Sequence, residues 1–307
     1  MSDEEKYDEA LQLIDGVVEK KDASPEGYIL RANVLSSKKD YEPALKDLGK
    51  ALELEPRNLA ALLTRAQVHS SKEDYKEALA DVTRALELRP GMFNAIVLRS
   101  QIALSAGEYK QSLADLRSIL RTDPGNSGLK MQIAAVYVAD ERPNLAIDMY
   151  DQILEKDDEM WEAYRGRADA YLGMGEHSKA VDDYSKAIEG MPEDSGLLNN
   201  FAWLLSTSTF DTLRDGQRAV KLAERACKIT EYKAAHILST LAASYAETGD
   251  FEKAVEWSTK AVKMGDGQVV EQLAQELSRY KEKKPWREKQ EVAEEEKEDL
   301  DKDLDGL

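Results

Sequence analysis

Apolar, aromatic and small residues recur in this chain at a fixed interval of 34 residues. Alanine or serine recurs at two places of the interval, tyrosine recurs at a third place, and proline recurs at a fourth. A constant period of this length indicates one structural unit that is repeated many times. The four series are Ala32, Ala66, Ser100, Ala134 and Ala168; Ala44, Ala78, Ser112, Ala146 and Ala180; Tyr41, Tyr75 and Tyr109; and Pro56, Pro90, Pro124 and Pro192, with Asp158 where one proline is missing.

The residue types at these places predict two antiparallel helices in each unit. Small residues such as Ala66 and Ala78 allow the two helices to approach closely, and the tyrosine at the start of the second helix packs under the first. The proline ends the second helix because proline cannot continue a helix. One helical hairpin cannot bury its own apolar face, so neighbouring hairpins must stack. The pattern therefore predicts an all-α fold built as an α-α superhelix.

The interval and the residue types resemble those of the tetratricopeptide repeat (TPR) family, over roughly residues 5–282. The segment YKEALADVTRALELRP, residues 75–90, is similar to the second helix and closing proline of that family. From residue 195 onward, the sequence resembles the C-terminal part of many bacterial TPR proteins. The resemblance implies a right-handed solenoid that binds other proteins.

We expect about seven full hairpins with a single helix at each end. Residues 206–220 add about five residues between the two helices of the sixth hairpin, which predicts a longer loop. The expected hairpins span 25–57, 59–91, 93–125, 127–159, 161–193, 195–231 and 235–266. The expected domains are a half-repeat or capping helix at 1–24, the TPR array at 25–266, a C-terminal capping helix at 267–283, and an acidic disordered tail at 284–307.

The charge narrows the range of partners, and the apolar runs and the cysteine content bear on membranes and disulfides. A formal net charge of −18 repels nucleic acids and anionic membranes and favours neutral or basic partners; the alternative is that this charge only maintains solubility. No apolar run is long enough to span a membrane, and the N-terminus lacks the features of a signal peptide. Cys227 is the only cysteine, so no intrachain disulfide can form and the compartment is undetermined.

Motifs of catalysis and cofactor binding are absent from the sequence. There is no glycine-rich phosphate loop, no metal-spaced cluster of histidine and cysteine, and no nucleophile motif, so we expect no enzyme activity, cofactor or metal. The last residues, 301–307 (DKDLDGL), resemble the opening of an EF-hand calcium loop, with Asp301, Asp303, Asp305 and Gly306 at matching positions. That loop needs a glutamate at its twelfth position, so a calcium-responsive module requires sequence beyond Leu307.

Arginine and aspartate co-vary between the repeats. Arginine at the seventh place of a unit always occurs with aspartate at the twenty-third place, and where the arginine is replaced by an apolar residue, so is the aspartate. An inward-facing arginine needs an anionic partner, because an unpaired buried charge is costly. We predict four partly buried, structural ion pairs: Arg31 with Asp47, Arg65 with Asp81, Arg99 with Asp115, and Arg167 with Asp183.

By resemblance to the family, the first helices line a concave groove, and certain places of each helix face into it. The fifth place reads Ile29, Leu63, Val97, Met131 and Arg165, and the ninth reads Asn33, Gln67, Gln101, Ala135 and Asp169. Side-chain amides can bond a peptide backbone of any sequence, and the apolar row offers pockets for its side chains. Further along, Asn199 and Asn200 add polar groups, and Trp203 is a candidate anchor. The alternative is that all these residues only pack against the next unit.

The resemblance therefore predicts a non-enzymatic scaffold or adaptor that binds a peptide or protein partner of unknown identity. The partner is not the C-terminal carboxylate of a heat-shock protein, because family members that clamp it carry lysine and arginine where this chain has Ile29, Asn94 and Leu98, and only Asn33 matches. A purely architectural or self-associating solenoid is the alternative. Aligned and exposed Asn33, Gln67 and Gln101 favour the adaptor, whereas closed packing of the groove favours the alternative.

Overall fold

The computed structural model describes residues 3–18, 24–267 and 269–288, and these residues form an all-α fold. Within these ranges there are sixteen α-helices and one short 3-10 helix, and no helix is long and apolar enough to cross a membrane. The helices are α1 (Asp3–Val18), α2 (Pro25–Ser37), α3 (Tyr41–Leu54), α4 (Leu59–Ser71), α5 (Tyr75–Leu88), α6 (Phe93–Ser105), α7 (Tyr109–Leu120), α8 (Ser127–Ala139), α9 (Pro143–Leu154), α10 (Trp161–Gly173), α11 (His177–Gly190), α12 (Ser195–Thr207), η1 (Asp211–Leu213), α13 (Gly216–Ile229), α14 (Ala235–Glu247), α15 (Phe251–Met264) and α16 (Val269–Lys281).

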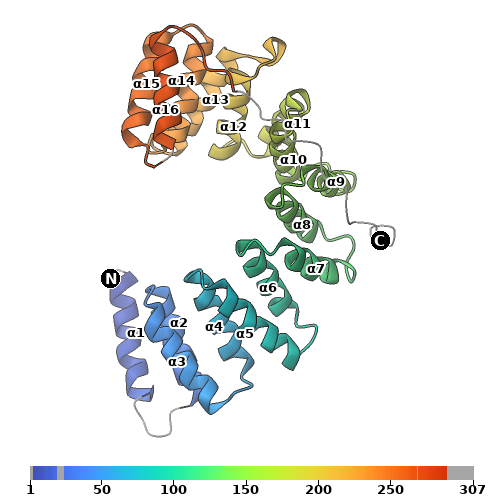
Figure 1. The fold of residues 1–307 in the computed structure, drawn as a ribbon, viewed down its shortest axis with the longest axis vertical. Coiled ribbons are helices and arrows are strands. Elements are labelled where there is room, and N and C mark those ends of the chain that lie inside the picture. The colour runs from blue at the N-terminus through green and yellow to red at the C-terminus, as the bar shows by residue number, and fades with distance from the viewer. Residues whose placement is uncertain (1–2, 19–23, 268, 289–307) are drawn as a thin grey trace. The chain divides into compact units, whose positions relative to one another are not determined.

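The chain divides into two compact units, residues 1–140 and 141–307, which we describe separately. The N-terminal unit holds α1–α8, in which α2 packs on α3, α4 on α5 and α6 on α7 (Figure 1). The C-terminal unit holds α9–α16, in which α10 packs on α11, α12 on α13 and α14 on α15 (Figure 1). The all-α architecture predicted from the repeat period is confirmed.

Small buried residues and repeated turns set the register of the hairpins. Ala66 of α4 and Ala78 of α5 have no exposed surface, which is what allows these two helices to pack closely. The turn inside each of the first five hairpins contains a residue with positive φ, at the same place of the repeat. Glycine occupies this place in two of the hairpins, and lysine or glutamate adopts the same left-handed conformation in the other three. The residues are Lys39, Glu73, Gly107, Glu141 and Gly175.

The inserted loop of the sixth hairpin is held against its neighbours. It contains η1, and Arg214 at its end donates from Nε to Glu247 of α14 at 2.8 Å and from Nη1 to the Ser208 carbonyl at 2.9 Å. His177 of α11 lies 2.7 Å from the Ser208 hydroxyl and packs edge-to-face on Phe210. The longer loop that the sequence predicts is therefore an ordered bridge between α11 and α14.

Contacts continue past α16 into the segment that the sequence analysis assigned to the tail. Residues 285–288 lie against α12 and α14, where the Glu288 amide donates to the Thr207 carbonyl at 3.2 Å and Arg287 Nη1 donates to the Ser206 carbonyl at 3.1 Å. These two carbonyls are at the C-terminal end of α12, where a helix leaves acceptors without intrahelical partners. The rest of the predicted tail, including the calcium-like sequence at 301–306, lies outside the described residues.

Candidate functional site

The four arginine–aspartate pairs form in the structure as two-point contacts between the helices of one hairpin. In the second hairpin, Arg65 donates from Nε to Asp81 Oδ2 at 2.7 Å and from Nη2 to Oδ1 at 2.6 Å. The aspartate side chain is 8% exposed and the arginine side chain 26% exposed, so the pair is partly buried. The same geometry joins Arg31 to Asp47, Arg99 to Asp115 and Arg167 to Asp183.

Two of these arginines also contact a carboxylate on the helix before their own hairpin. Arg31 Nη1 donates to Asp15 of α1 at 2.8 Å, and Arg167 Nη1 donates to Asp151 of α9. Neither aspartate was among the predicted ion-pair residues. The signal was present, because each aspartate precedes its arginine by the same sequence distance that separates the arginine from its partner within the hairpin. These arginines therefore join one repeat to the next as well as the two helices within a repeat.

Several first helices of neighbouring hairpins touch each other directly. Among the described residues, such contacts join α2 to α4, α10 to α12 and α12 to α14, whereas no comparable contact joins two second helices. The side on which the first helices meet is therefore the more tightly curved side within each unit. We call it the first-helix face.

In the N-terminal unit, Asn33, Gln67 and Gln101 occupy the same place on the first helices α2, α4 and α6, and we call them the amide row. All three residues are exposed, and none of their side-chain amides hydrogen-bonds to another described residue. Beside them lie the half-buried residues Ile29, Leu63 and Val97, which we call the apolar row. The first two of these pack partly against the core alanines and leucines beneath them and leave part of their surface to solvent.

A shallow hollow borders the apolar row at one end of α4. Leu63 lines it together with Met92, Phe93 and Asn94 at the start of α6. Phe93 is 59% exposed, which is unusual for a phenylalanine beside a hollow. Phe93 was not among the predicted site residues, because its place in the repeat, held by Leu59 and Ser127 in the neighbouring repeats, is not one of the places expected to face the groove.

In the C-terminal unit, the predicted groove residues already have partners within the chain. Arg165 Nη1 donates to Asp194 at 2.7 Å. Asp169 accepts from the Tyr184 hydroxyl at 2.5 Å and from the Asn200 amide at 3.0 Å. Burial raises the pKa of Tyr184, so this hydroxyl stays protonated and acts as a donor. This patch is therefore more constrained than the amide row of the N-terminal unit.

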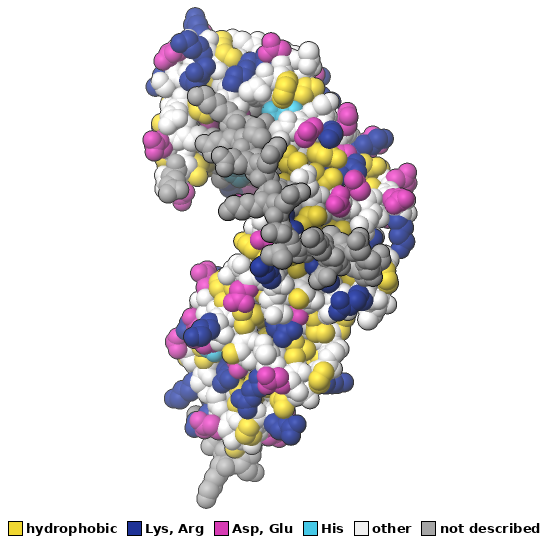
Figure 2. Space-filling view, turned by 45° about the vertical axis from the view of Figure 1, so that its right-hand side comes forward, with side chains coloured by type: hydrophobic (Ala, Val, Ile, Leu, Met, Phe, Trp, Pro, Cys, Tyr) yellow, Lys and Arg dark blue, Asp and Glu magenta, His cyan; other side chains and the backbone are white. Residues whose placement is uncertain are grey.

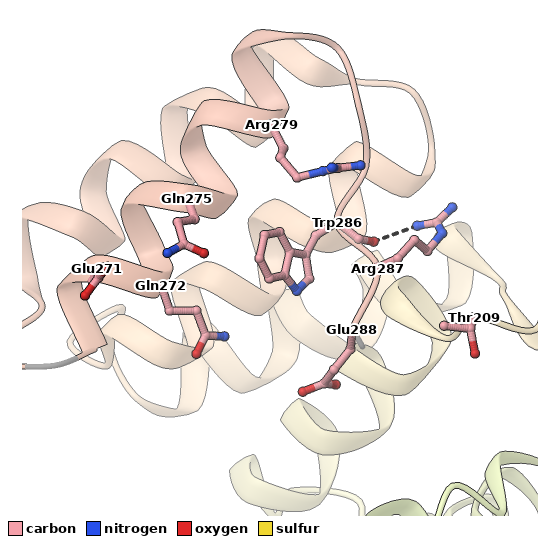
Figure 3. A pocket seen from close by; sticks show the side chains of 8 residues that line it. All are labelled: Thr209, Glu271, Gln272, Gln275, Arg279, Trp286, Arg287 and Glu288. Carbon is pink, nitrogen blue, oxygen red and sulfur yellow. Dashed lines mark hydrogen bonds between the residues drawn. The ribbon is translucent and has the colours of Figure 1, made fainter. Parts of the chain in front are cut away.

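Trp203, the predicted anchor, contacts the segment that follows α16. Its indole Nε1 donates to the Glu288 carboxylate, and it shares an apolar cluster with Trp286 and the buried Tyr280. Figure 3 shows the Trp286 ring facing α16, where Gln272 and Gln275 lie. Arg287 adds an ion pair of 2.6 Å to Glu247 of α14. Nothing in the sequence signals this docking, because residues 284–307 read as a charged tail.

Charged groups are spread over the surface. On the described part of the face seen in Figure 2, Lys and Arg side chains lie among Asp and Glu side chains, with apolar side chains between them. Within residues 3–18, 24–267 and 269–288, no group of three or more His, Cys, Asp or Glu side chains could hold a metal ion. Cys227 is buried, and this burial raises its pKa to about 12.

Family models of known proteins match the repeating part of this chain. Family models described as tetratricopeptide repeat match residues 29–92, 63–127, 103–166, 162–189 and 235–264, which together cover more than half of the chain. No curated protein matches the chain.

Solved structures share the fold at low sequence identity. Yeast Tom70 is 19% identical with a TM-score of 0.63, over 90% of this chain and 59% of the Tom70 chain, so the present chain spans less than two thirds of that protein. A tetratricopeptide repeat protein from Parabacteroides merdae is 20% identical with a TM-score of 0.57, over 84% of this chain and 98% of the other. The C-terminal part of a TPR repeat-containing protein from Cytophaga hutchinsonii is 16% identical with a TM-score of 0.59, over 74% and 92% of the two chains.

Proposed function

This chain belongs to the tetratricopeptide repeat family, and from that membership we propose that it is a non-enzymatic adaptor for a protein partner. Repeats of this family generally mediate protein–protein interactions. The partner contributes an extended peptide segment, which binds along the first-helix face of the N-terminal unit.

The observation that carries this proposal is the exposure of the amide row. Asn33, Gln67 and Gln101 occupy the same place on successive first helices, and no described residue uses their hydrogen-bonding groups. A side-chain amide both donates and accepts, so each can bond one peptide unit of a partner regardless of its sequence. The half-buried apolar row beside them supplies contact surface for alternate side chains of the same peptide.

The spacing of the helices suits an extended chain. Packed helices lie about 8–10 Å apart, and an extended peptide advances about 3.3 Å per residue. Amides on two directly packed first helices, such as Asn33 of α2 and Gln67 of α4, would therefore meet the partner about three residues apart. The net charge of −18 favours a neutral or basic segment, because it attracts cations over a long range.

A purely architectural role is the second candidate, and it is favoured by the C-terminal unit. There Arg165, Asp169 and Trp203 are all engaged within the chain, as a packing role requires. The two roles are compatible, since one unit can stabilise the array while the other binds the partner.

Affinity capture from lysate with a matched pair of variants tests the adaptor function. The groove variant is Leu63→Ala/Gln67→Ala/Gln101→Ala, and the control truncates three exposed side chains of the second helices: Lys76→Ala/Glu87→Ala/Lys110→Ala. Two lost amide hydrogen bonds and one lost apolar contact at about 1 kcal/mol each weaken binding by about 100-fold. We expect a partner that is retained by the wild type and the control and lost by the groove variant. Identical captured sets from all three proteins would refute the amide row as the site.

A further inference from the structure

A second hollow lies on the first-helix face of the C-terminal unit and is rich in hydrogen-bond acceptors. We call it the acceptor pocket. Its volume is about 270 Å³, below the range of about 300–1,000 Å³ that is typical of small-molecule sites, so it suits one side chain. The residues that matter below are Asn199 and Trp203 of α12, Ser239 of α14, Gln272 and Glu276 of α16, and Glu288.

Glu276 brings a buried carboxyl group to this pocket without a cation beside it. The residue is 1% exposed. It accepts from the Ser239 hydroxyl and from Gln272 Nε2 at 3.1 Å, and both of these partners are neutral. Burial raises its pKa, and the nearby Glu288 carboxylate raises it further. A carboxylate in such a place is normally paired with a positive charge, because burying an unpaired charge is costly.

Asn199 adds an acceptor that has no partner. The Asp169 carboxylate can only accept, so Asn200 must present its NH2 group there, at 3.0 Å. The Asn200 oxygen then faces Asn199, which donates to it from Nδ2 at 3.2 Å. This chain of bonds fixes the orientation of the Asn199 amide, and its Oδ1 atom is left buried without a hydrogen bond among the described residues.

Glu288 and Trp203 add two more groups that favour a positive charge. Glu288 is held in place by the indole Nε1–H of Trp203, which donates to one of its two carboxylate oxygens. The Trp203 ring also lines the pocket, and an indole face attracts cations. Two carboxyl groups, the Asn199 amide and one aromatic ring thus line a hollow the size of a side chain.

We propose that the acceptor pocket binds a basic side chain, lysine or arginine, of the protein partner. This proposal rests on the proposed function, because the basic side chain belongs to a protein that the chain holds. Ammonium and guanidinium groups only donate hydrogen bonds, so they match the two carboxyl groups and the Asn199 oxygen, although His236 and Thr240 of the same lining can also donate. A cation there balances the charge of Glu276 and gives Asn199 Oδ1 its missing donor.

Small probes test the pocket without the unidentified partner. Nα-acetyl-lysine methylamide and Nα-acetyl-arginine methylamide are titrated into the full chain, and binding is followed by the NMR signal of the Trp203 indole N–H, assigned with Trp203→Phe. The uncharged probe is Nα-acetyl-norleucine methylamide, which has nearly the shape of the lysine probe. We expect a saturable shift with at least one cationic probe, and a response to norleucine that is at least tenfold weaker.

Two variants and a control assign the effect to the pocket. Glu276→Gln keeps the shape and removes the charge, and Asn199→Ala removes the free oxygen; each should weaken the cationic probe at least tenfold. Glu271→Gln removes a carboxylate from the exposed surface of the same helix and should leave binding unchanged. No shift with either cationic probe, equal binding of norleucine, or equal binding by Glu276→Gln would each overturn the proposal. The Gln67→Ala/Gln101→Ala variant should respond as wild type, so failure of this pocket and failure of the N-terminal groove are distinguished.

Discussion

Removing Arg65 should destabilise the second hairpin far more than removing its partner, Asp81. The arginine holds the carboxylate by two hydrogen bonds of 2.6 and 2.7 Å between α4 and α5. The Asp81 side chain is 8% exposed, so the variant Arg65→Leu leaves a carboxylate that water hardly reaches. The Arg65 side chain is 26% exposed, so in the variant Asp81→Leu the guanidinium can turn towards solvent.

This difference sets the expected free energies. Leaving the buried carboxylate unpaired costs about 3–4 kcal/mol, and leaving the more exposed arginine unpaired costs about 1–2 kcal/mol. Replacing both residues by leucine costs about 1 kcal/mol, because an apolar pair of similar volume fills the space without an unpaired charge. The coupling energy of the double-mutant cycle is therefore about 3–5 kcal/mol.

Urea unfolding and native-state hydrogen exchange of α4 and α5 measure this coupling, and exchange is needed because single repeats can open locally. The matched control is a cycle on Lys50 and Glu53, whose side chains are 2.8 Å apart but 50% and 68% exposed. That exposed pair should give a coupling of about 0.5 kcal/mol or less. A coupling for Arg65 and Asp81 as small as that of the control would refute the assignment of a structural role to these pairs.

Two further predictions concern the C-terminal unit. Gly190→Ala should lower Tm, with a loss of about 1–3 kcal/mol, because a Cβ atom there would lie 1.9 Å from the Trp161 ring. Gly173→Ala meets nothing within 4 Å and should raise stability by up to about 1 kcal/mol; equal effects of the two changes on thermal unfolding would contradict this. The stability of the wild type relative to Glu276→Gln should fall as the pH rises above 4.5, the ordinary pKa of glutamate. Burial raises the pKa of Glu276 in the folded state, so the folded protein holds the Glu276 proton more tightly than the unfolded protein does. Urea unfolding of both proteins at about pH 5 and about pH 8 measures this, and a pH-independent difference would count against it.

The sequence by itself determined the repeating part of this protein. The constant period specifies helix pairs because it fixes the spacing of residues such as Ala66 and Ala78 within one hairpin. Inside a hairpin, the distance between two residues along the sequence determines how far apart they lie in space. The same argument paired Arg65 with Asp81, since a fixed sequence offset places both on facing sides of one hairpin. The peptide groove stays a prediction, although the exposure of Gln67 is what that prediction requires.

Only the tertiary structure decided how the segment after α16 docks and which groups meet at the acceptor pocket. The docking of residues 285–288 on α12 joins Trp203 to Glu288, and the acceptor pocket unites side chains from α12, α14 and α16. No period relates these residues, because each pair occurs once. Their contacts depend on how neighbouring hairpins stack and on which carbonyls are left open at a helix end, and a one-dimensional pattern does not specify either of these.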